Sequence, residues 1–264
     1  MMNTSHALIG YTGFVGQTLL KQKSFTALYR STNINHIQGQ EFDLVVCAGV
    51  SAKKWLANLH PNKDIANIQR LIEHLKTIRA RRFILISTVD VFKKPSCVTE
   101  KDSADDPDTQ AYGLNRRVLE KFVEQHFDNH LIVRLPGLVG PGLQKNVIFD
   151  FHHDHQTDKI NSADISQFYP MVNCWPDIEI ALENQLQLIH LTAAPISNKD
   201  VAREGFGISC HQSVKSPPIC YDLQTIYAHL YGRQGCYQYD RTSSLLAIRA
   251  YAQSEPKITP DTSS

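Results

Sequence analysis

The chain has 264 residues, of which 42% are hydrophobic and 20% charged, so it can build one large globular domain or one domain with a smaller companion. Its formal net charge of +1 does not indicate binding to nucleic acid or to an acidic membrane, so only individual binding sites can indicate its partners. No stretch approaches about 18 consecutive apolar residues and the short polar start has no signal-peptide pattern, so we expect a cytoplasmic protein that does not enter the membrane.

Short apolar strands alternate with amphipathic helices over the first 135 residues. Strands are predicted at residues 7–9, 25–29, 42–47, 82–87 and 130–135. Helices are predicted at residues 17–22, 64–79 and 109–125. This alternation indicates an α/β fold, a Rossmann-type doubly wound parallel sheet, with little room for a helix between the second and third strands.

Beyond residue 135 the pattern changes to loops rich in glycine and proline. Short helices are predicted at residues 177–183, 197–203 and 243–253. We therefore expect a dinucleotide-binding core over residues 1–135 and a smaller substrate-binding lobe with returning core elements over 136–254. Residues 255–264, rich in proline, serine and threonine, are predicted to form a flexible tail.

A glycine-rich loop joins the first strand to the first helix. Gly10, Gly13 and Gly16 are spaced three residues apart, which permits a tight turn and a close approach of backbone to a pyrophosphate. The helix that follows would offer free N–H groups and the positive end of its dipole. The loop residues expected to contact a dinucleotide are Gly10, Thr12, Gly13, Phe14, Val15 and Gly16.

The end of the second strand bears on the choice of cofactor. About 20 residues after the first glycine, an NAD site usually carries an acid that holds the ribose 2′-hydroxyl. Here the place reads Tyr29-Arg30-Ser31-Thr32, without an acid. An arginine beside hydroxyls suits a 2′-phosphate, so we expect Arg30 and Ser31 to contact the cofactor and NADP to be preferred over NAD. The alternative is that Arg30 is simply exposed to solvent.

Two further segments carry polar side chains that suit acid–base chemistry. Tyr112 and Arg116 stand four residues apart at the start of a predicted helix, so both lie on one helical face. Thr88 ends the fourth predicted strand, in the segment Ser87-Thr-Val-Asp-Val-Phe92.

The glycine loop, Thr88 and Tyr112 occur in the order typical of one family. Together they resemble the extended short-chain dehydrogenase/reductase superfamily, in its NAD-dependent epimerase/dehydratase branch, and the resemblance covers most of the chain. It implies that Tyr112 moves the proton, that Thr88 binds the reacting oxygen, and that Arg116 holds the cofactor ribose. It further implies cofactor contacts at Ala48, Gly49, Tyr112, Arg116 and Pro136, and substrate contacts at Asp90, Gly137 and Asn146.

Four positions depart from the pattern of the family. Arg116 stands where lysine is usual; it supplies positive charge but cannot join a proton relay. Asp64 stands where an asparagine usually structures the site, and Gly137 takes the place of an asparagine found in many epimerases. Val89 replaces the first of the two acids of sugar-nucleotide dehydratases, which disfavours water elimination. The tyrosine would serve as acid or base if its pKa fell toward the working pH.

We therefore expect an NAD(P)-dependent oxidoreductase or epimerase acting on a nucleotide-linked or related sugar, with hydride transfer at a carbinol or ketone carbon. The alternative is a catalytically silent NAD(P)-binding sensor or assembly protein. Phe151-His-His-Asp-His155 is interpreted as a polar loop, and no metal is expected, since neighbouring residues rarely converge on one ion. A homodimer through the helices at 64–79 and 109–125 is expected from the family resemblance.

Overall fold

The computed structural model describes residues 5–212 and 217–257, and the chain divides into two compact units. The first unit takes in the chain up to Pro95, Thr99–Leu135 and Asn173–Leu191. The second takes in Ser96–Val98, Pro136–Val172 and the chain from Thr192 onward. Residues 173–191 therefore return to the first unit, although they follow a long stretch of the second.

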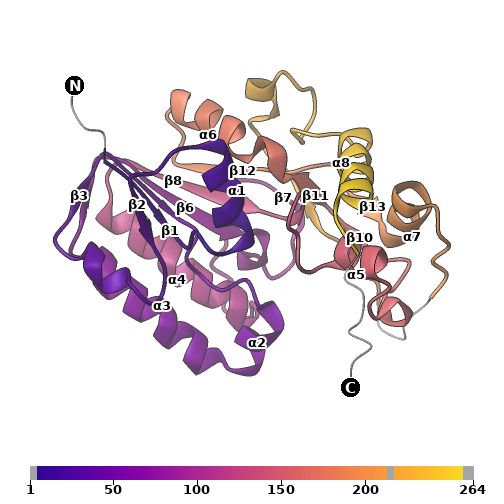
Figure 1. Ribbon diagram of the computed structural model, residues 1–264, viewed down its shortest axis with the longest axis horizontal. Coiled ribbons are helices and arrows are strands. Elements are labelled where there is room, and N and C mark those ends of the chain that lie inside the picture. The colour runs from indigo at the N-terminus through magenta and orange to yellow at the C-terminus, as the bar shows by residue number, and fades with distance from the viewer. Residues whose placement is uncertain (1–4, 213–216, 258–264) are drawn as a thin grey trace. The chain divides into compact units, whose positions relative to one another are not determined.

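The first unit is built on a six-stranded parallel sheet (Figure 1). In sheet order its strands are β12 (Leu188–His190), β8 (His130–Leu135), β6 (Phe83–Thr88), β4 (Leu44–Cys47), β1 (His6–Ile9) and β2 (Ala27–Tyr29). The chain passes from β2 at one edge across β1 to β4, which is the change of direction that defines a doubly wound sheet. The predicted fold class is confirmed.

Helices cover both faces of this sheet. α1 packs near α6 on one face, and α3 packs along α4 on the other (Figure 1). Their bounds are α1 (Phe14–Gln22), α2 (Lys54–Leu59), α3 (Pro61–Leu75), α4 (Ala111–His126) and α6 (Cys174–Glu183). The strands are apolar on both sides, and on the side of α3 and α4 they form one buried cluster with these helices, which includes Val45, Phe83, Leu119 and Ile132.

Several predicted boundaries needed correction. The predicted strand at 42–47 is interrupted at Asp43, with β3 (Glu41–Phe42) pairing with β5 (Arg79–Ala80) and β4 beginning afterwards. The predicted helix at 64–79 begins at Pro61 and ends at Leu75, because proline is favourable in a first turn and Arg79 joins β5. Between β2 and β3 there is one turn of 3₁₀-helix, η1 (Ile34–Ile37), so the expected lack of room for a crossover helix is confirmed.

The second unit consists of short strand pairs and short helices. Its strands are β7 (Ser96–Val98), β9 (Gly137–Val139), β10 (Ile165–Ser166), β11 (Phe168–Pro170), β13 (Ile196–Ser197) and β14 (Asp222–Leu223). Its helices are α5 (Val147–His153), α7 (Asn198–Asp200) with a π-helical continuation (Val201–Phe206), and α8 (Arg241–Ser254). β9 and β11 pair in parallel, as do β7 and β14, whereas β10 and β13 are antiparallel.

The start of the predicted tail is held in place. The Gly142 amide donates to Glu255 Oε1 at 3.1 Å, and Lys257 Nζ lies 3.6 Å from Asp154 Oδ2. Residues 258–264 of that prediction lie outside the described residues. Within the described part of the chain, no helix is long and apolar enough to cross a membrane.

Candidate active site

Close backbone contacts require glycine at two positions of the loop after β1. Gly10 has φ +86°, a left-handed conformation, and a Cβ there would collide with the carbonyl of Ala48 at the end of β4. A Cβ on Gly16 would collide with the carbonyl of Gly10. Gly13 is different, because the nearest atom to a Cβ there is Gly10 O at 3.6 Å, an ordinary contact. The chain itself therefore does not require glycine at position 13.

The N-terminus of α1 has the features of an anion site. Gly13 is its N-cap, no side chain caps it, and its first turn contains no acid. Thr12 and Gly13 are exposed, while Phe14 and Val15 are half-buried at the start of the helix. Free N–H groups and the helix dipole favour a phosphate at such a terminus, and the missing Cβ of Gly13 leaves space for it. These residues fit a dinucleotide pyrophosphate.

Arg30 directly follows β2 beside this loop. The Gly10 amide donates to the carbonyl of Tyr29 at 2.7 Å, which ties the end of β2 to the glycine loop. Arg30 and Ser31 are exposed; Arg30 Nε donates to Thr32 Oγ1 at 2.9 Å. Asn33 Oδ1 accepts from the Arg30 amide at 2.7 Å, which holds the turn. No acidic side chain stands at the end of β2, so a cation and two hydroxyls occupy that place.

Ala48 and Gly49 follow β4 and adjoin the same loop. The Ala48 amide donates to the carbonyl of Ile9 at 2.9 Å, and a Cβ on Gly49 would press against the Ile9 side chain at 2.8 Å. The ends of β1, β2 and β4 therefore meet around the glycine loop, at the edge of a parallel sheet where ligands of this fold class bind.

Thr88 and Tyr112 are brought together at the carboxyl end of β6. Thr88 begins the 3₁₀ turn η2 (Val89–Val91), and its Oγ1 accepts from the Asp90 amide at 3.2 Å. Tyr112 lies in the first turn of α4, is 7% exposed, and its hydroxyl hydrogen-bonds with the Thr88 side chain. Two hydroxyls from distant parts of the sequence thus share one site.

Burial raises the pKa of the Tyr112 hydroxyl above its ordinary value. Arg116 and Lys54 oppose this rise through their positive charge, and the hydrogen bond with Thr88 also lowers the pKa; Asp90 adds to the rise. The net direction of the pKa shift is opposite to the lowering that the sequence analysis set as the condition for Tyr112 to serve as acid or base. At neutral pH the phenol keeps its proton, which suits donation rather than abstraction.

Sequence reasoning missed two residues that position Tyr112. A Cβ on Gly113 would collide with the carbonyl of Asp90, so glycine allows the start of α4 to pack against η2. Asn58 Oδ1 on α2 accepts from the Tyr112 amide at 2.9 Å and so caps α4. The sequence signal for Asn58 was absent because α2 was not predicted; Gly113, next to the tyrosine, was visible in the motif.

Arg116 is engaged on almost all sides by protein groups. Its guanidinium forms a two-pronged ion pair with Asp64 of α3, through NH1 to Oδ2 and through NH2 to Oδ1 at 3.1 Å. NH2 also donates to the carbonyl of Ser51 at 2.5 Å, and NH1 donates to that of Tyr112 at 3.2 Å. The side chain is 5% exposed and its Cζ lies 3.9 Å from the centroid of the Tyr112 ring.

Two departures from the family pattern therefore meet in one ion pair. The Asp64 carboxylate balances the charge of the buried Arg116 guanidinium and accepts from both of its terminal nitrogens. Of the nitrogens of Arg116, Nε is buried and has no hydrogen-bond partner among the described residues. The terminal nitrogens, which sequence analysis assigned to the ribose, are bound to the protein itself.

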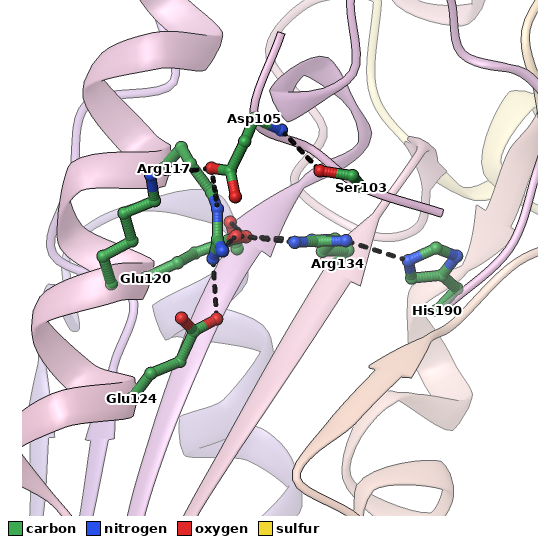
Figure 2. Close-up of polar contacts among 9 residues, drawn as sticks. Ser103, Asp105, Arg117, Glu120, Glu124, Arg134 and His190 are labelled. Carbon is green, nitrogen blue, oxygen red and sulfur yellow. Dashed lines mark hydrogen bonds and ion pairs between the residues drawn. The ribbon is translucent and has the colours of Figure 1, made fainter. Parts of the chain in front are cut away.

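A buried polar network connects α4, β6 and β8 near the carboxyl end of β6 (Figure 2). Ser87 Oγ donates to Glu120 Oε1 at 2.5 Å, and Arg134 of β8 donates to both oxygens of Glu120 at 3.0 and 2.8 Å. Glu120 is fully buried on α4, one turn beyond Arg116. Figure 2 shows the network extending from Arg134 to His190 at 3.4 Å. It ties α4 to β6, and so aligns Tyr112 with Thr88.

The remaining predicted site residues belong to the second unit. Pro136 is buried directly after β8. Gly137 begins β9, where a Cβ would collide with the carbonyl of Gln167. Asn146 has φ +109° and caps α5: its Oδ1 accepts from Ile148 and its Nδ2 donates to the carbonyl of Leu138 at 2.8 Å. Local packing thus employs both Gly137 and the Asn146 side chain.

In the described residues, no three or more histidine, cysteine, aspartate or glutamate side chains are arranged to hold a metal ion. The histidines of the segment after Phe151 make local contacts instead: His152 Nε2 lies 2.9 Å from the carbonyl of Glu255, and His155 Nδ1 lies 2.9 Å from Asp150 Oδ1.

The doubly wound sheet, the glycine loop and the Thr88–Tyr112 pair together define a member of the extended short-chain dehydrogenase/reductase superfamily. Residues 24–168 match the family model described as the NAD dependent epimerase/dehydratase family. This match covers more than half of the chain, so the chain belongs to that family. The glycine loop lies outside the matched residues and rests on the geometry above.

Solved structures of the same fold are similar over nearly the whole chain. dTDP-4-dehydrorhamnose reductase from Yersinia enterocolitica is 15% identical with a TM-score of 0.72, covering 95% of this chain and 99% of that one. The same enzyme from Bacillus anthracis, in complex with NADP, is 14% identical with a TM-score of 0.72, covering 96% and 100%.

An epimerase is similar to the same extent. UDP-glucuronic acid 4-epimerase from Bacillus cereus, in complex with NAD, is 17% identical with a TM-score of 0.67, covering 95% of this chain and 99% of that one. These identities establish a shared fold. Comparison with curated protein sequences gives no match.

Proposed function

We propose that the protein is an NADP(H)-dependent oxidoreductase that reduces a keto group on a nucleotide-linked or related sugar. The observation that carries the proposal is the meeting of the Thr88 and Tyr112 hydroxyls at the end of β6. The Tyr112 phenol, which is protonated at neutral pH, can donate its proton to a carbonyl oxygen, as reduction requires. Similar structures include reductases and epimerases of nucleotide sugars, which supports this substrate class.

Each step assigns a task to one side chain. The Thr88 hydroxyl orients the carbonyl oxygen of the substrate, and Tyr112 donates its proton to that oxygen as the carbonyl becomes a hydroxyl. When bound, a reduced nicotinamide would supply the hydride for the new C–H bond. The Tyr112 phenolate then recovers a proton from solvent. Arg116 stabilises the transient phenolate from its place beside the ring, 3.9 Å from the centroid.

The cofactor is proposed to lie along the ends of β1, β2 and β4. The loop residues Gly10, Gly13 and Gly16 would hold its pyrophosphate at the N-terminus of α1. Arg30 would bind the 2′-phosphate, since it is exposed and no acid competes for it. NADP is therefore preferred over NAD.

The test is oxidation of NADPH in the presence of a panel of nucleotide-diphosphate keto-sugars, followed by absorbance. We expect at least one keto-sugar to be reduced, with loss of the reaction in Tyr112→Phe. A reaction that persists in that variant would refute the assigned mechanism. Cytoplasmic location remains part of the proposal.

A second candidate is a catalytically silent NAD(P)-binding protein that acts as a sensor or assembly partner. The observation that favours it is the Asp64–Arg116 ion pair, which commits the terminal nitrogens of the guanidinium to protein oxygens. Tight binding of NADPH with no oxidation across a broad panel would support this candidate over the enzyme.

A further inference from the structure

A second cation stands beside Tyr112, on an element that the sequence analysis did not predict. Lys54 is the first residue of α2, and its Nζ lies 2.7 Å from Asp90 Oδ1. The Lys54 side chain is 38% exposed, whereas that of Arg116 is 5% exposed. The two cations therefore differ in exposure: Arg116 is enclosed by protein oxygens, and Lys54 borders solvent.

Asp90 connects Lys54 to the two hydroxyls. Its Oδ2 lies 3.4 Å from Thr88 Oγ1, and its amide donates to the same hydroxyl oxygen at 3.2 Å. The Asp90 side chain is 18% exposed, so its charge is only partly screened by water. A carboxylate in this position opposes negative charge on Tyr112, and an ammonium bound to that carboxylate offsets its effect.

The charges that face Tyr112 come from four elements. Arg116 lies on the same helix and is paired with Asp64 of α3. Asp90 lies in the turn after β6, and Lys54 lies on α2. Arg116 has the larger effect of the two cations, and both lower the pKa of the phenol, whereas Asp90 raises it.

We propose that Lys54 is a positioning residue for proton transfer at Tyr112, because its ammonium balances the charge of the Asp90 carboxylate, which contacts the Thr88 hydroxyl. The proposal rests on the proposed function in giving Tyr112 the proton to transfer. The Arg116–Asp64 pair is the more buried of the two ion pairs at the site, and the Lys54–Asp90 pair is the more exposed. Replacing Lys54 leaves the Asp90 carboxylate without the Lys54 ammonium beside the developing phenolate. Replacing Asp90 removes that carboxylate.

The test measures the phenol directly and does not need a substrate. Tyr112 is replaced by a difluorinated tyrosine, which ionises nearer neutral pH, where lysine and aspartate side chains keep their charges. Fluorine NMR then follows its titration in the full-length protein. We expect Lys54→Met to raise the titration midpoint and Asp90→Asn to lower it, each by on the order of one pH unit. The double variant should return close to the parent.

Lys53→Met is the matched control, because Lys53 is the exposed neighbour of Lys54 and should leave the midpoint unchanged. A merely structural role for Lys54 would not produce shifts of opposite sign that cancel in the double variant. Equal midpoints in Lys54→Met and the parent, or shifts of the same sign in both single variants, would overturn the proposal. These outcomes are independent of whether any keto-sugar is reduced, so failure of the proposed function is recognised separately.

Discussion

At the scale of single residues, Tyr112 is the proposed proton donor. Tyr112→Phe keeps the ring against Arg116 and removes only the hydroxyl, so the fold should persist while turnover falls about 100-fold or more. Steady-state oxidation of NADPH with an accepted keto-sugar measures this, and circular dichroism checks the fold. Because the pKa of the phenol is raised, reduction in the parent should stay constant through neutral pH and decline only under alkaline conditions. Full turnover in the variant would exclude Tyr112 as the acid.

Arg30 is the residue that we propose selects between the two cofactors. A charge-assisted contact with a phosphate contributes about 1.5–3 kcal/mol, so Arg30→Ala should weaken NADPH binding roughly tenfold or more and leave NADH binding nearly unchanged. Calorimetric titration of both cofactors into both proteins gives the comparison. Raised salt should weaken NADPH more than NADH, since the guanidinium is exposed. Equal losses for the two cofactors would show that Arg30 does not recognise the 2′-phosphate.

Residue by residue, the sequence was informative where a motif carried the chemistry. Gly10, Thr88 and Tyr112 occupy the positions expected from their spacing, because the order of strands and helices brings them to one edge of the sheet. The ion pair of Arg116 could not be predicted, because its partner Asp64 is far away in sequence and the pairing depends on how α3 packs against α4. Lys54 and Asn58 were missed because α2, on which both lie, was not predicted.

At the scale of elements, the approach of α4 to the turn after β6 depends on a missing side chain. Gly113→Ala should force α4 or the turn η2 to shift, with a loss of stability of about 1–3 kcal/mol and a displaced Tyr112. Urea unfolding and turnover measure the two effects. Gly13→Ala is the matched comparison: its Cβ meets only an ordinary contact at 3.6 Å, so stability should hold while dinucleotide binding weakens. Loss of stability in Gly13→Ala alone would reverse this assignment.

The pairing of α3 with α4 depends on the buried ion pair between Asp64 and Arg116. Asp64→Asn leaves the guanidinium without its countercharge, which should cost about 3–5 kcal/mol in the free energy of unfolding. Glu41→Gln is the control, because its partner Arg79 is 3.5 Å away and both side chains are exposed, so the loss should stay below about 1 kcal/mol. Similar losses of unfolding free energy in both variants would mean that the buried ion pair stabilises the fold no more than the exposed one.

Elements were predictable where their pattern was long and periodic. α3 and α4 were found with shifted ends, whereas α2 was missed: it has six residues and exposes Trp55 and Leu59, so no amphipathic pattern marks it. The segment at 42–47 was read as one strand because the interruption at Asp43 is a matter of pairing with β5, which apolar periodicity does not encode.

At the scale of the whole molecule, a homodimer through α3 and α4 remains a prediction. Val118 on α4 is 42% exposed and could contribute apolar contact area to such an interface. Sedimentation velocity at micromolar concentration should give a dimer, and Val118→Asp should shift it toward the monomer. A monomeric wild-type protein would remove the dimer and leave the catalytic proposal untouched.

The fold class of the molecule was accessible from the sequence because alternation of strand and helix leaves few topologies. The strand pairing of the second unit was not accessible from the sequence. Its strands have two or three residues each and are defined only by pairing with one another, as Phe168 pairs with Gly137. Asn146 is an example. The family resemblance implied a substrate contact for it, and the structure shows in addition that it has a positive φ and serves as the N-cap of α5.

The buried ion pair also makes the effects of substitutions at positions 64 and 116 interdependent. Arg116→Lys would leave Asp64 facing a point charge that cannot form a two-pronged contact, and Asp64→Asn would leave a buried guanidinium without its countercharge. Because the two side chains are in contact, we expect the losses of stability in the two single variants not to add in the double variant.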